Sequence, residues 1–173
     1  YDGASRLTNL VYRTSSNIVL QSFTYTYDKA GNPLRVHRED NLYEVYQYDK
    51  AYQLTRVDYD SATTSGPSTN WTRYTYDLVG NRLTLTNPVK AEVYQYDAAN
   101  RMLSVTSGTS VAQFYWDRNG NLTNKVENGT NTWYAWDYEN KLVTAKYQNG
   151  NSNTFSYYPS STLRHTKTDS TGT

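Results

Sequence analysis

Three sets of side chains in this sequence could do chemistry: two histidines, a series of regularly spaced aspartates, and a series of paired aromatic rings. His37 and His165 lie far apart in the chain, without cysteine or a local carboxylate pattern, so they are a weak basis for a metal site. No Gly-x-Ser-x-Gly motif, phosphate loop or metalloprotease motif occurs. We therefore predict no catalytic residue, no cofactor and no metal, and we do not expect an enzyme.

The aspartates belong to an internal repeat in which an aromatic residue directly precedes each Asp. The seven copies are Tyr1-Asp2, Tyr27-Asp28, Tyr48-Asp49, Tyr76-Asp77, Tyr96-Asp97, Trp116-Asp117 and Trp136-Asp137, with a degenerate eighth at Tyr157-Tyr158. Most successive copies lie 20 or 21 residues apart, and two longer gaps contain insertions. Such a period is typical of a repeat protein, in which each repeat is one supersecondary unit.

Carboxylates in register could bind a row of calcium ions, or each Asp could accept hydrogen bonds from backbone N–H groups of its own turn. In three copies a Gly-Asn pair follows the Asp at the third and fourth positions. These pairs are Gly31-Asn32, Gly80-Asn81 and Gly120-Asn121. Because Gly-Asn supplies the positive φ that lets a chain reverse, the sequence favours the structural role for the Asp and leaves calcium as the alternative.

The aromatic residues come in pairs two residues apart, so both rings of a pair lie on one face of a strand. The pairs are Tyr25/Tyr27, Tyr46/Tyr48, Tyr74/Tyr76, Tyr94/Tyr96, Phe114/Trp116, Tyr134/Trp136 and Phe155/Tyr157. They could form a sugar-binding surface or the core that holds neighbouring hairpins together. Only 36% of the residues are hydrophobic while 15% are aromatic, which favours the core.

Each copy reads as a strand, a turn at the Asp and a second strand, so the chain is predicted to be all-β, with about eight tandem antiparallel β-hairpins in a single array over residues 1–173. Copies with Gly-Asn alternate with copies that usually carry a basic residue in place of the Asn. In the first kind apolar residues follow the turn two apart, as in Leu34/Val36, which predicts a one-faced strand. In the second kind they are three apart, as in Leu54/Val57, which predicts a bulge or a strand buried on both sides in every second hairpin.

The remaining composition limits the partners. Seventeen basic and 16 acidic side chains give a net charge of +1, so neither nucleic acid nor an acidic membrane is indicated as a partner. No stretch approaches the roughly 20 apolar residues of a membrane-spanning helix. The longest insertion, Asp60–Asn70, is rich in Ser, Thr, Gly and Pro and is predicted to be an exposed, mobile loop. Asn-x-Ser/Thr triplets at Asn70, Asn121 and Asn128 would be glycosylation acceptors only in a eukaryotic source.

The pattern is most complete in "YTYDLVGNRL" at residues 74–83, which closely resembles the YD repeats of the Rhs family. That family includes bacterial Rhs and wall-associated polymorphic toxins, the shell-forming component of Tc insecticidal toxins, and teneurins. The resemblance covers nearly the whole chain. It implies hairpins that form one curved, spiralling sheet, part of a hollow β-shell or solenoid that commonly encloses a toxic C-terminal polypeptide.

The sequence also departs from the family. The Rhs core with its Asp-Pro-x-Gly-Arg motif and self-cleavage site is absent, and residues 157–167 resemble a degraded repeat with Tyr158 in place of Asp and Ser161 in place of Gly. Neither self-cleavage nor toxin activity is assigned. We expect a fragment of a longer, secreted or cell-surface bacterial protein.

We expect this fragment to act as a structural segment whose partners are the rest of its own chain and an encapsulated polypeptide. The alternatives are an extracellular adhesion module that binds surface glycans, and a surface fibre that assembles from copies of the chain.

Overall fold

The computed structural model describes residues 1–159 and 161–170. Over these residues the chain is all-β, with 15 strands, antiparallel pairing and no helix, which confirms the predicted fold class. Residue 160, inside the degenerate eighth copy, and residues 171–173, at the end of the predicted array, lie outside the described residues.

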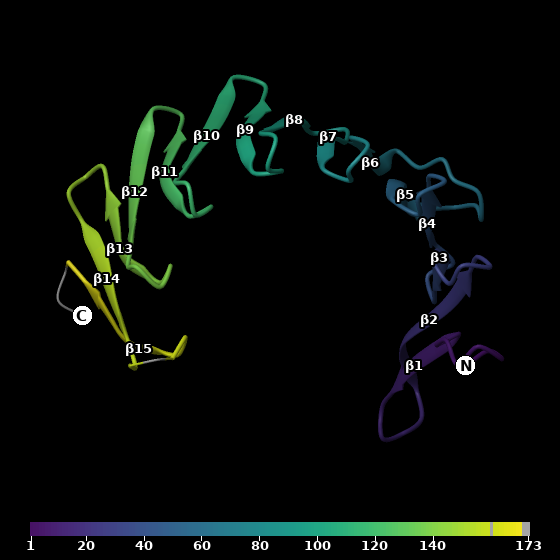
Figure 1. The fold of residues 1–173 in the computed structure, drawn as a ribbon. Coiled ribbons are helices and arrows are strands. Elements are labelled where there is room, and N and C mark those ends of the chain that lie inside the picture. The colour runs from purple at the N-terminus through teal and green to yellow at the C-terminus, as the bar shows by residue number, and fades with distance from the viewer. Residues whose placement is uncertain (160, 171–173) are drawn as a thin grey trace. The chain divides into compact units, whose positions relative to one another are not determined.

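The chain divides into two compact units, Tyr1–Ala91 and Glu92–Thr173. The strands of the first unit are β1 (Asn9–Arg13), β2 (Val19–Tyr27), β3 (Pro33–Arg38), β4 (Tyr43–Tyr48), β5 (Leu54–Ser61), β6 (Asn70–Tyr76) and β7 (Arg82–Thr86). Those of the second unit are β8 (Ala91–Tyr96, which begins at the boundary), β9 (Met102–Ser107), β10 (Ser110–Trp116), β11 (Leu122–Glu127), β12 (Thr130–Trp136), β13 (Leu142–Tyr147), β14 (Ser152–Tyr157) and β15 (Arg164–Asp169). Within each unit, turns and a few longer loops join strands that lie side by side in chain order (Figure 1).

Strand β2 shows why these residues form strands. Tyr and Thr favour extended backbone, and the run Phe23–Tyr27 alternates between half-buried rings and exposed threonines. The same alternation is found before each later Asp, for example in β10, where Phe114 and Trp116 are half-buried and Tyr115 is exposed. One face of each strand therefore carries the paired aromatic rings.

Few side chains are fully buried. Among the described residues the buried ones are Val45, Val57, Tyr94, Ala145, Asp58, Ser61 and Thr72. Each unit thus has a thin core of half-buried aromatic rings rather than a thick aliphatic core. The prediction that the aromatic pairs form the core holds only in part, because three of the four fully buried apolar side chains among the described residues, Val45, Val57 and Ala145, are aliphatic.

Hairpins are also linked at the rim opposite the Asp turns. There a side chain at or beside one turn accepts a hydrogen bond from a backbone N–H of the preceding hairpin, 17 or 18 residues earlier. The four bonds run from Ser22 N to Glu39 Oε2 (3.0 Å), Val111 N to Asn128 Oδ1 (2.9 Å), Asn131 N to Gln148 Oε1 (2.6 Å) and Ser152 N to Ser170 Oγ (3.0 Å). These bonds satisfy backbone donors where the strand ladder ends.

Candidate functional site

The repeated Asp turn is the most regular feature of the structure. Asp28 Oδ1 accepts hydrogen bonds from the backbone N of Ala30 (2.9 Å) and Asn32 (2.8 Å), and Oδ2 accepts one from Asn32 Nδ2 (2.9 Å). The backbone closes the turn, since Asp28 N donates to Asn32 O (2.9 Å) and Gly31 N donates to Asp28 O (3.2 Å). The carboxylate therefore holds the second and fourth residues that follow it, while the Asp28 backbone bonds the third and fourth.

The other copies repeat these contacts. The backbone N of the fourth residue after the Asp donates to the carboxylate in every copy: from Arg6 to Asp2, Gln53 to Asp49, Asn81 to Asp77, Arg101 to Asp97, Asn121 to Asp117 and Lys141 to Asp137. Since these oxygens face donors of their own turn, they are poorly placed to bind calcium. Among the described residues there is also no group of three or more His, Asp or Glu side chains that could hold a metal ion.

The same hydrogen bonds lower the pKa of several turn carboxyls. For Asp28 and Asp77 the largest cause is the side-chain bond from the Asn four residues on. For Asp2, Asp97 and Asp117 it is the backbone N–H at that position. These donors favour the ionised carboxylate over the protonated acid.

Stability should therefore fall in acid. A carboxyl whose pKa is lowered on folding stabilises the native state above its unfolded pKa of about 3.9, and this contribution disappears as the pH falls through the lower folded value. We expect the urea midpoint to be constant from pH 7 to about pH 5 and to drop steeply below about pH 4. Urea titrations followed by circular dichroism would measure it. An unchanged midpoint at about pH 2 would contradict the role of the turn carboxylates.

The third residue after each Asp adopts a left-handed backbone in both kinds of copy. Its φ is 96°, 95° and 87° at Gly31, Gly80 and Gly120, and 59–61° at Ser5, Tyr52, Asn100 and Asn140. The Asn of the Gly-Asn pair is not among the residues with positive φ, so the glycine alone provides that freedom. Asn tolerates this region better than other residues, whereas a bulky Tyr there is strained.

Tyr52→Asn should therefore stabilise the protein by about 1 kcal/mol, because it removes a strained Tyr that is 63% exposed. Chemical denaturation would measure the gain. Tyr138→Asn is the matched control, since Tyr138 is 92% exposed and does not have a positive φ. Equal effects of the two substitutions would show that backbone strain at residue 52 is not the cause.

A register shift follows the turn in both kinds of copy. In the Gly-Asn copy at Asp28, Tyr27 pairs with Pro33 and Thr26 with Arg35, so Leu34 is an extra residue. The bulge predicted for the base-carrying hairpins is present, but its restriction to every second hairpin is wrong: all seven hairpins from β2–β3 to β14–β15, six with an Asp and one with Tyr158, shift at this point.

The shift also explains the two spacings of apolar residues. Leu54 and Val57 are three apart, yet they pair with Tyr48 and Tyr46 on one face because Thr55 is the extra residue between them. The one-faced strand predicted for Leu34 and Val36 is wrong, since Leu34 is itself the extra residue. The turn sets the shift, because the turn has the same hydrogen bonds in both kinds of copy.

In five copies the aromatic residue at the position before the turn, Tyr27, Tyr76, Trp116, Trp136 or Tyr157, is bonded to the preceding copy. The O–H of Tyr or the ring N–H of Trp donates to a backbone carbonyl of the preceding copy, and the acceptor residue lies just before the extra residue of that copy's register shift. We call this hydrogen bond the inter-repeat bond. Five such bonds are Tyr27 Oη to Leu7 O (2.7 Å), Tyr76 Oη to Leu54 O (2.8 Å), Trp116 Nε1 to Met102 O (2.8 Å), Trp136 Nε1 to Leu122 O (2.7 Å) and Tyr157 Oη to Leu142 O (2.9 Å). Tyr and Trp can replace each other because both present a donor at the far end of the ring.

Basic side chains add a second link between copies. Arg6 Nε donates to Asp2 Oδ2 (2.7 Å), while a terminal nitrogen of the same guanidinium donates to Asp28 O (3.0 Å) in the next copy. Its guanidinium carbon lies 4.7 Å from the Tyr27 ring centre. Arg101 repeats the two hydrogen bonds, to Asp97 (2.7 Å) and to Asp117 O (2.8 Å). The fixed fork of Arg suits this bridging position.

The insertion is attached to the sheet rather than free of it. Asp58 is completely buried at the base of the insertion, where Arg56 Nε (2.6 Å) and Ser68 N (2.9 Å) donate to its carboxylate. Ser61 is also buried, and Arg35 Nε donates to Thr64 O in the middle of the insertion. Most of Asp60–Asn70 is exposed, as predicted, but β5 extends to Ser61 and these contacts hold the segment.

The two histidines and the three candidate glycosylation asparagines make ring contacts or hydrogen bonds with neighbouring residues. His37 stacks on Tyr43 with ring centres 4.4 Å apart, and His165 meets the edge of Tyr158 at 4.7 Å. Asn70 Nδ2 donates to Asp60 and Asn121 Nδ2 to Asp117, whereas Asn128 Oδ1 is an acceptor. A glycan on Asn121 would remove a donor from its turn.

Sequence reasoning missed the inter-repeat bond and one exposed surface of the second unit. The bond has a signal in the sequence: the residue before the Asp is always Tyr or Trp, whereas the aromatic residue two positions earlier can be Phe. The surface includes Tyr115, Trp133 and a cavity of about 650 Å³ lined by Val111, Gln113 and Val126, among others. Its signal is an aromatic residue at positions where no other copy has one.

Comparison with known proteins gives a likeness in fold. No protein-family model matches the chain, and no curated protein matches it in sequence. A crystal structure of TcdB2-TccC3 matches 83% of this chain with a TM-score of 0.63 and 14% identity. A crystal structure of TcdB2-TccC3-TEV matches 89% with a TM-score of 0.59 and 16% identity, and a Photorhabdus luminescens Tc holotoxin pore matches 95% with 0.54 and 14%. The chain spans 9%, 8% and 13% of the lengths of those three chains. The likeness shows a shared fold.

Proposed function

We propose that this chain is a structural segment of a hollow shell built from Rhs/YD repeats, in which a curved, spiralling sheet encloses a toxin or another C-terminal polypeptide. The observation that carries the proposal is the inter-repeat bond, which recurs in both units and links five hairpins to the copy before them. Repeats joined in this way depend on their neighbours for stability, as the elements of a continuous wall do.

The titratable groups support a structural rather than a catalytic role. The turn carboxyls whose pKa is lowered have their donors within their own turn, so they are held ionised as acceptors. Burial and the neighbouring Glu44 raise the pKa of Tyr46, which keeps its hydroxyl protonated as a donor to Glu44 Oε2 at 2.5 Å. Because its pKa is raised, this hydroxyl remains a hydrogen-bond donor at neutral pH.

The partners follow from the same proposal. The aromatic face of each strand is only half-buried, and such a face is expected to be covered by another surface. We assign this cover to further YD repeats of the longer chain and to the enclosed polypeptide. The fold shared with Tc toxin chains supports a secreted or cell-surface protein of bacterial origin. No helix that could cross a membrane occurs among the described residues.

Protease protection tests enclosure directly. The longest natural protein that contains this segment is treated with proteinase K under native conditions, and digestion of its C-terminal polypeptide is followed by mass spectrometry. We expect the polypeptide to be protected in the native protein and digested after unfolding in urea. Digestion at the same rate in both states would contradict enclosure.

The adhesion alternative places glycans on the paired aromatic rows. It is disfavoured because Trp116 and Trp136 use their ring N–H groups in inter-repeat bonds. Trp116→Ala and Trp136→Ala, tested on a glycan array, separate the two functions: loss of folding supports the structural role, and loss of binding by a folded protein supports adhesion. Sedimentation at increasing concentration would reveal the fibre alternative.

A further inference from the structure

The first unit has a pocket in which two arginines are paired across neighbouring strands. Arg56 on β5 pairs directly with Arg73 on β6, and Gln47 on β4 pairs with Arg56. Directly paired residues share one face of the sheet, and like charges in such a pair are destabilising. The three side chains line a pocket of about 260 Å³, to which the insertion contributes Ser65 and Pro67.

The hairpins do not require the charge of Arg73. At its place, four residues before the Asp or Tyr158, the other copies have Thr24, Val45, Val93, Gln113, Trp133 and Thr154. At the place of Arg56, seven residues after the Asp, they have Asn9, Arg35, Thr84, Ser104, Asn124 and Thr144. Since every other copy forms with an uncharged residue at the first of these positions, the repeat does not explain the paired arginines.

Asp58 neutralises only one of the two guanidiniums. Arg56 Nε and Nη2 donate to the Asp58 carboxylate at 2.6 and 2.5 Å, and Ser68 N donates to it at 2.9 Å. The side-chain hydrogen bonds from Arg56 lower the pKa of Asp58, so this buried carboxyl is ionised at neutral pH. Asp58 is thus committed to Arg56 and to the insertion.

Arg73 has no carboxylate of its own. Its guanidinium carbon lies 4.9 Å from the centre of the Trp71 ring, and that of Arg56 lies 5.2 Å from the same ring. Within residues 1–159 and 161–170, no hydrogen bond or ion pair holds the Arg73 side chain, which is exposed. The two guanidiniums and the one carboxylate that line the pocket therefore leave an excess of one positive charge.

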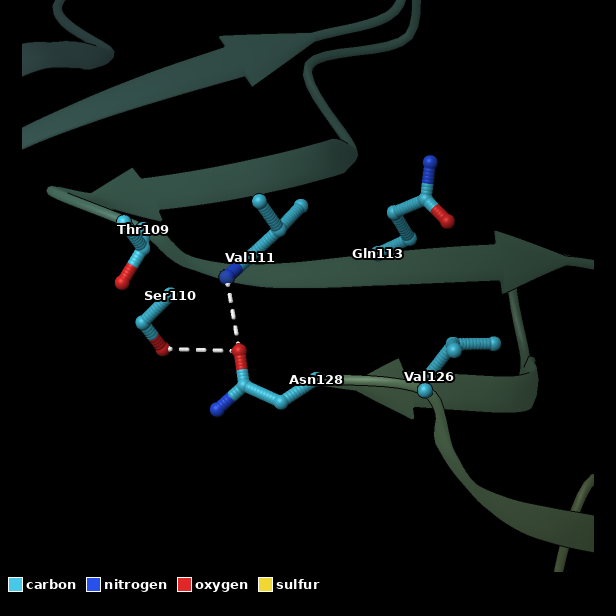
Figure 2. A pocket seen from close by; sticks show the side chains of 7 residues that line it. Thr109, Ser110, Val111, Gln113, Val126 and Asn128 are labelled. Carbon is cyan, nitrogen blue, oxygen red and sulfur yellow. Dashed lines mark hydrogen bonds between the residues drawn. The ribbon is translucent and has the colours of Figure 1, made fainter.

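A larger hollow in the second unit differs from this pocket in its chemistry. It has a volume of about 650 Å³, and none of the side chains that line it is charged. At its edge Asn128 Oδ1 accepts hydrogen bonds from Val111 N (2.9 Å) and Ser110 Oγ (3.0 Å), as Figure 2 shows. Recognition of an ion is therefore favoured in the smaller pocket, where the charges are.

We propose that the pocket of Gln47, Arg56 and Arg73, which we call the Arg56–Arg73 pocket, binds a carboxylate group. A guanidinium presents N–H donors in a fixed fork that matches the two oxygens of a carboxylate. Arg73 supplies this fork, and the side-chain amide of Gln47 can add a further donor.

The charge of the pocket selects a carboxylate over phosphate. One carboxylate cancels the excess positive charge, whereas a doubly charged phosphate would leave an excess negative charge beside the buried Asp58. The carboxylate can belong to an acidic side chain of a polypeptide or to a small carboxylic acid. The proposal does not depend on the shell role, since it rests on residues of the first unit alone.

Nuclear magnetic resonance of the arginine Nε–H groups in the 173-residue protein tests this proposal. The protein is titrated at constant ionic strength with acetate, with phosphate, with a capped pentapeptide that has one central Glu, and with the same peptide carrying Gln in that place. We expect the Arg73 resonance to shift with acetate and with the Glu peptide, and the Gln peptide to bind at least about tenfold more weakly.

The ligands also distinguish the source of the carboxylate. Tighter binding of the Glu peptide than of acetate supports an acidic polypeptide segment, and equal binding supports a small carboxylic acid. Tighter binding of phosphate than of acetate would overturn the carboxylate assignment. Equal binding of the Glu and Gln peptides, or an unshifted Arg73 resonance with both acetate and the Glu peptide, would overturn the site itself. These comparisons need only the wild-type protein.

Arg73→Gln should weaken binding of the Glu peptide about tenfold or more, because it removes the guanidinium that has no partner. Its melting temperature should be kept, since Gln113 occupies the same place in another copy. Arg118→Gln is the matched control, because Arg118 is an exposed arginine on a turn of the second unit, and it should leave binding unchanged. Equal binding by the wild type and a folded Arg73→Gln variant would contradict the proposal.

Discussion

Asp58→Ala should lower the free energy of unfolding of the first unit by about 3–5 kcal/mol. Asp58 is fully buried, and two guanidinium nitrogens of Arg56 donate to its carboxylate at 2.6 and 2.5 Å. The bond from Arg56 lowers the pKa of Asp58, so the carboxylate is ionised at neutral pH. Its removal leaves a nearly buried Arg56 without its partner and frees Ser68 N of the insertion. Urea denaturation at pH 7 measures the loss.

Asp60→Asn is the matched control for this prediction, because Asn removes the charge and tolerates the positive φ of residue 60. Asp60 pairs with Arg38 at 2.6 Å, but its side chain is 44% exposed. Exposed ion pairs contribute less than about 1 kcal/mol, so this variant should stay close to the wild type. If both substitutions cost the same, the buried pair does not anchor the insertion as described.

Trp136→Phe should lower the free energy of unfolding of the second unit by about 1–3 kcal/mol, because it removes the N–H donor and leaves the Leu122 carbonyl without its partner. Trp136→Tyr should recover part of this loss, since Tyr27, Tyr76 and Tyr157 make the same bond at the same place in their copies. Thermal and urea unfolding of the three proteins would measure the differences.

Tyr134→Phe is the control, because it removes a polar ring hydrogen that makes no inter-repeat bond. Tyr134 precedes Trp136 by two residues, at a position where Phe114 and Phe155 occur in other copies. Loss of the Tyr134 hydroxyl should lower the free energy of unfolding by well under about 1 kcal/mol. A similar cost for Tyr134→Phe and Trp136→Phe would mean that the inter-repeat bond is not what distinguishes the residue before the Asp.

The strands and turns were predictable because their signals are local. Alternating Tyr and Thr set the strand period, and the Asp with its following Gly-Asn marks the chain reversal in "FTYTYDKAGNPL", residues 23–34. The spacing of two residues between the aromatic rings likewise predicted that both rings lie on one face of each strand. These features depend on neighbouring residues, so a single sequence shows them.

The errors came from features that depend on two strands at once. The spacing of Leu54 and Val57 differs from that of Leu34 and Val36, which suggested two kinds of hairpin, but the turn imposes one register shift on both. The insertion was expected to be a free loop because of its composition, and its attachment to buried Asp58 could not be seen without the partner strand.

Electron cryo-microscopy of the longest natural protein that contains this segment tests the central claim most directly. We predict a map in which the hairpins form one wall of a hollow shell, with each residue before an Asp contacting the preceding hairpin and with density for an enclosed polypeptide. A map in which two sheets pack face to face over an aliphatic core, with no enclosed space, would contradict the account.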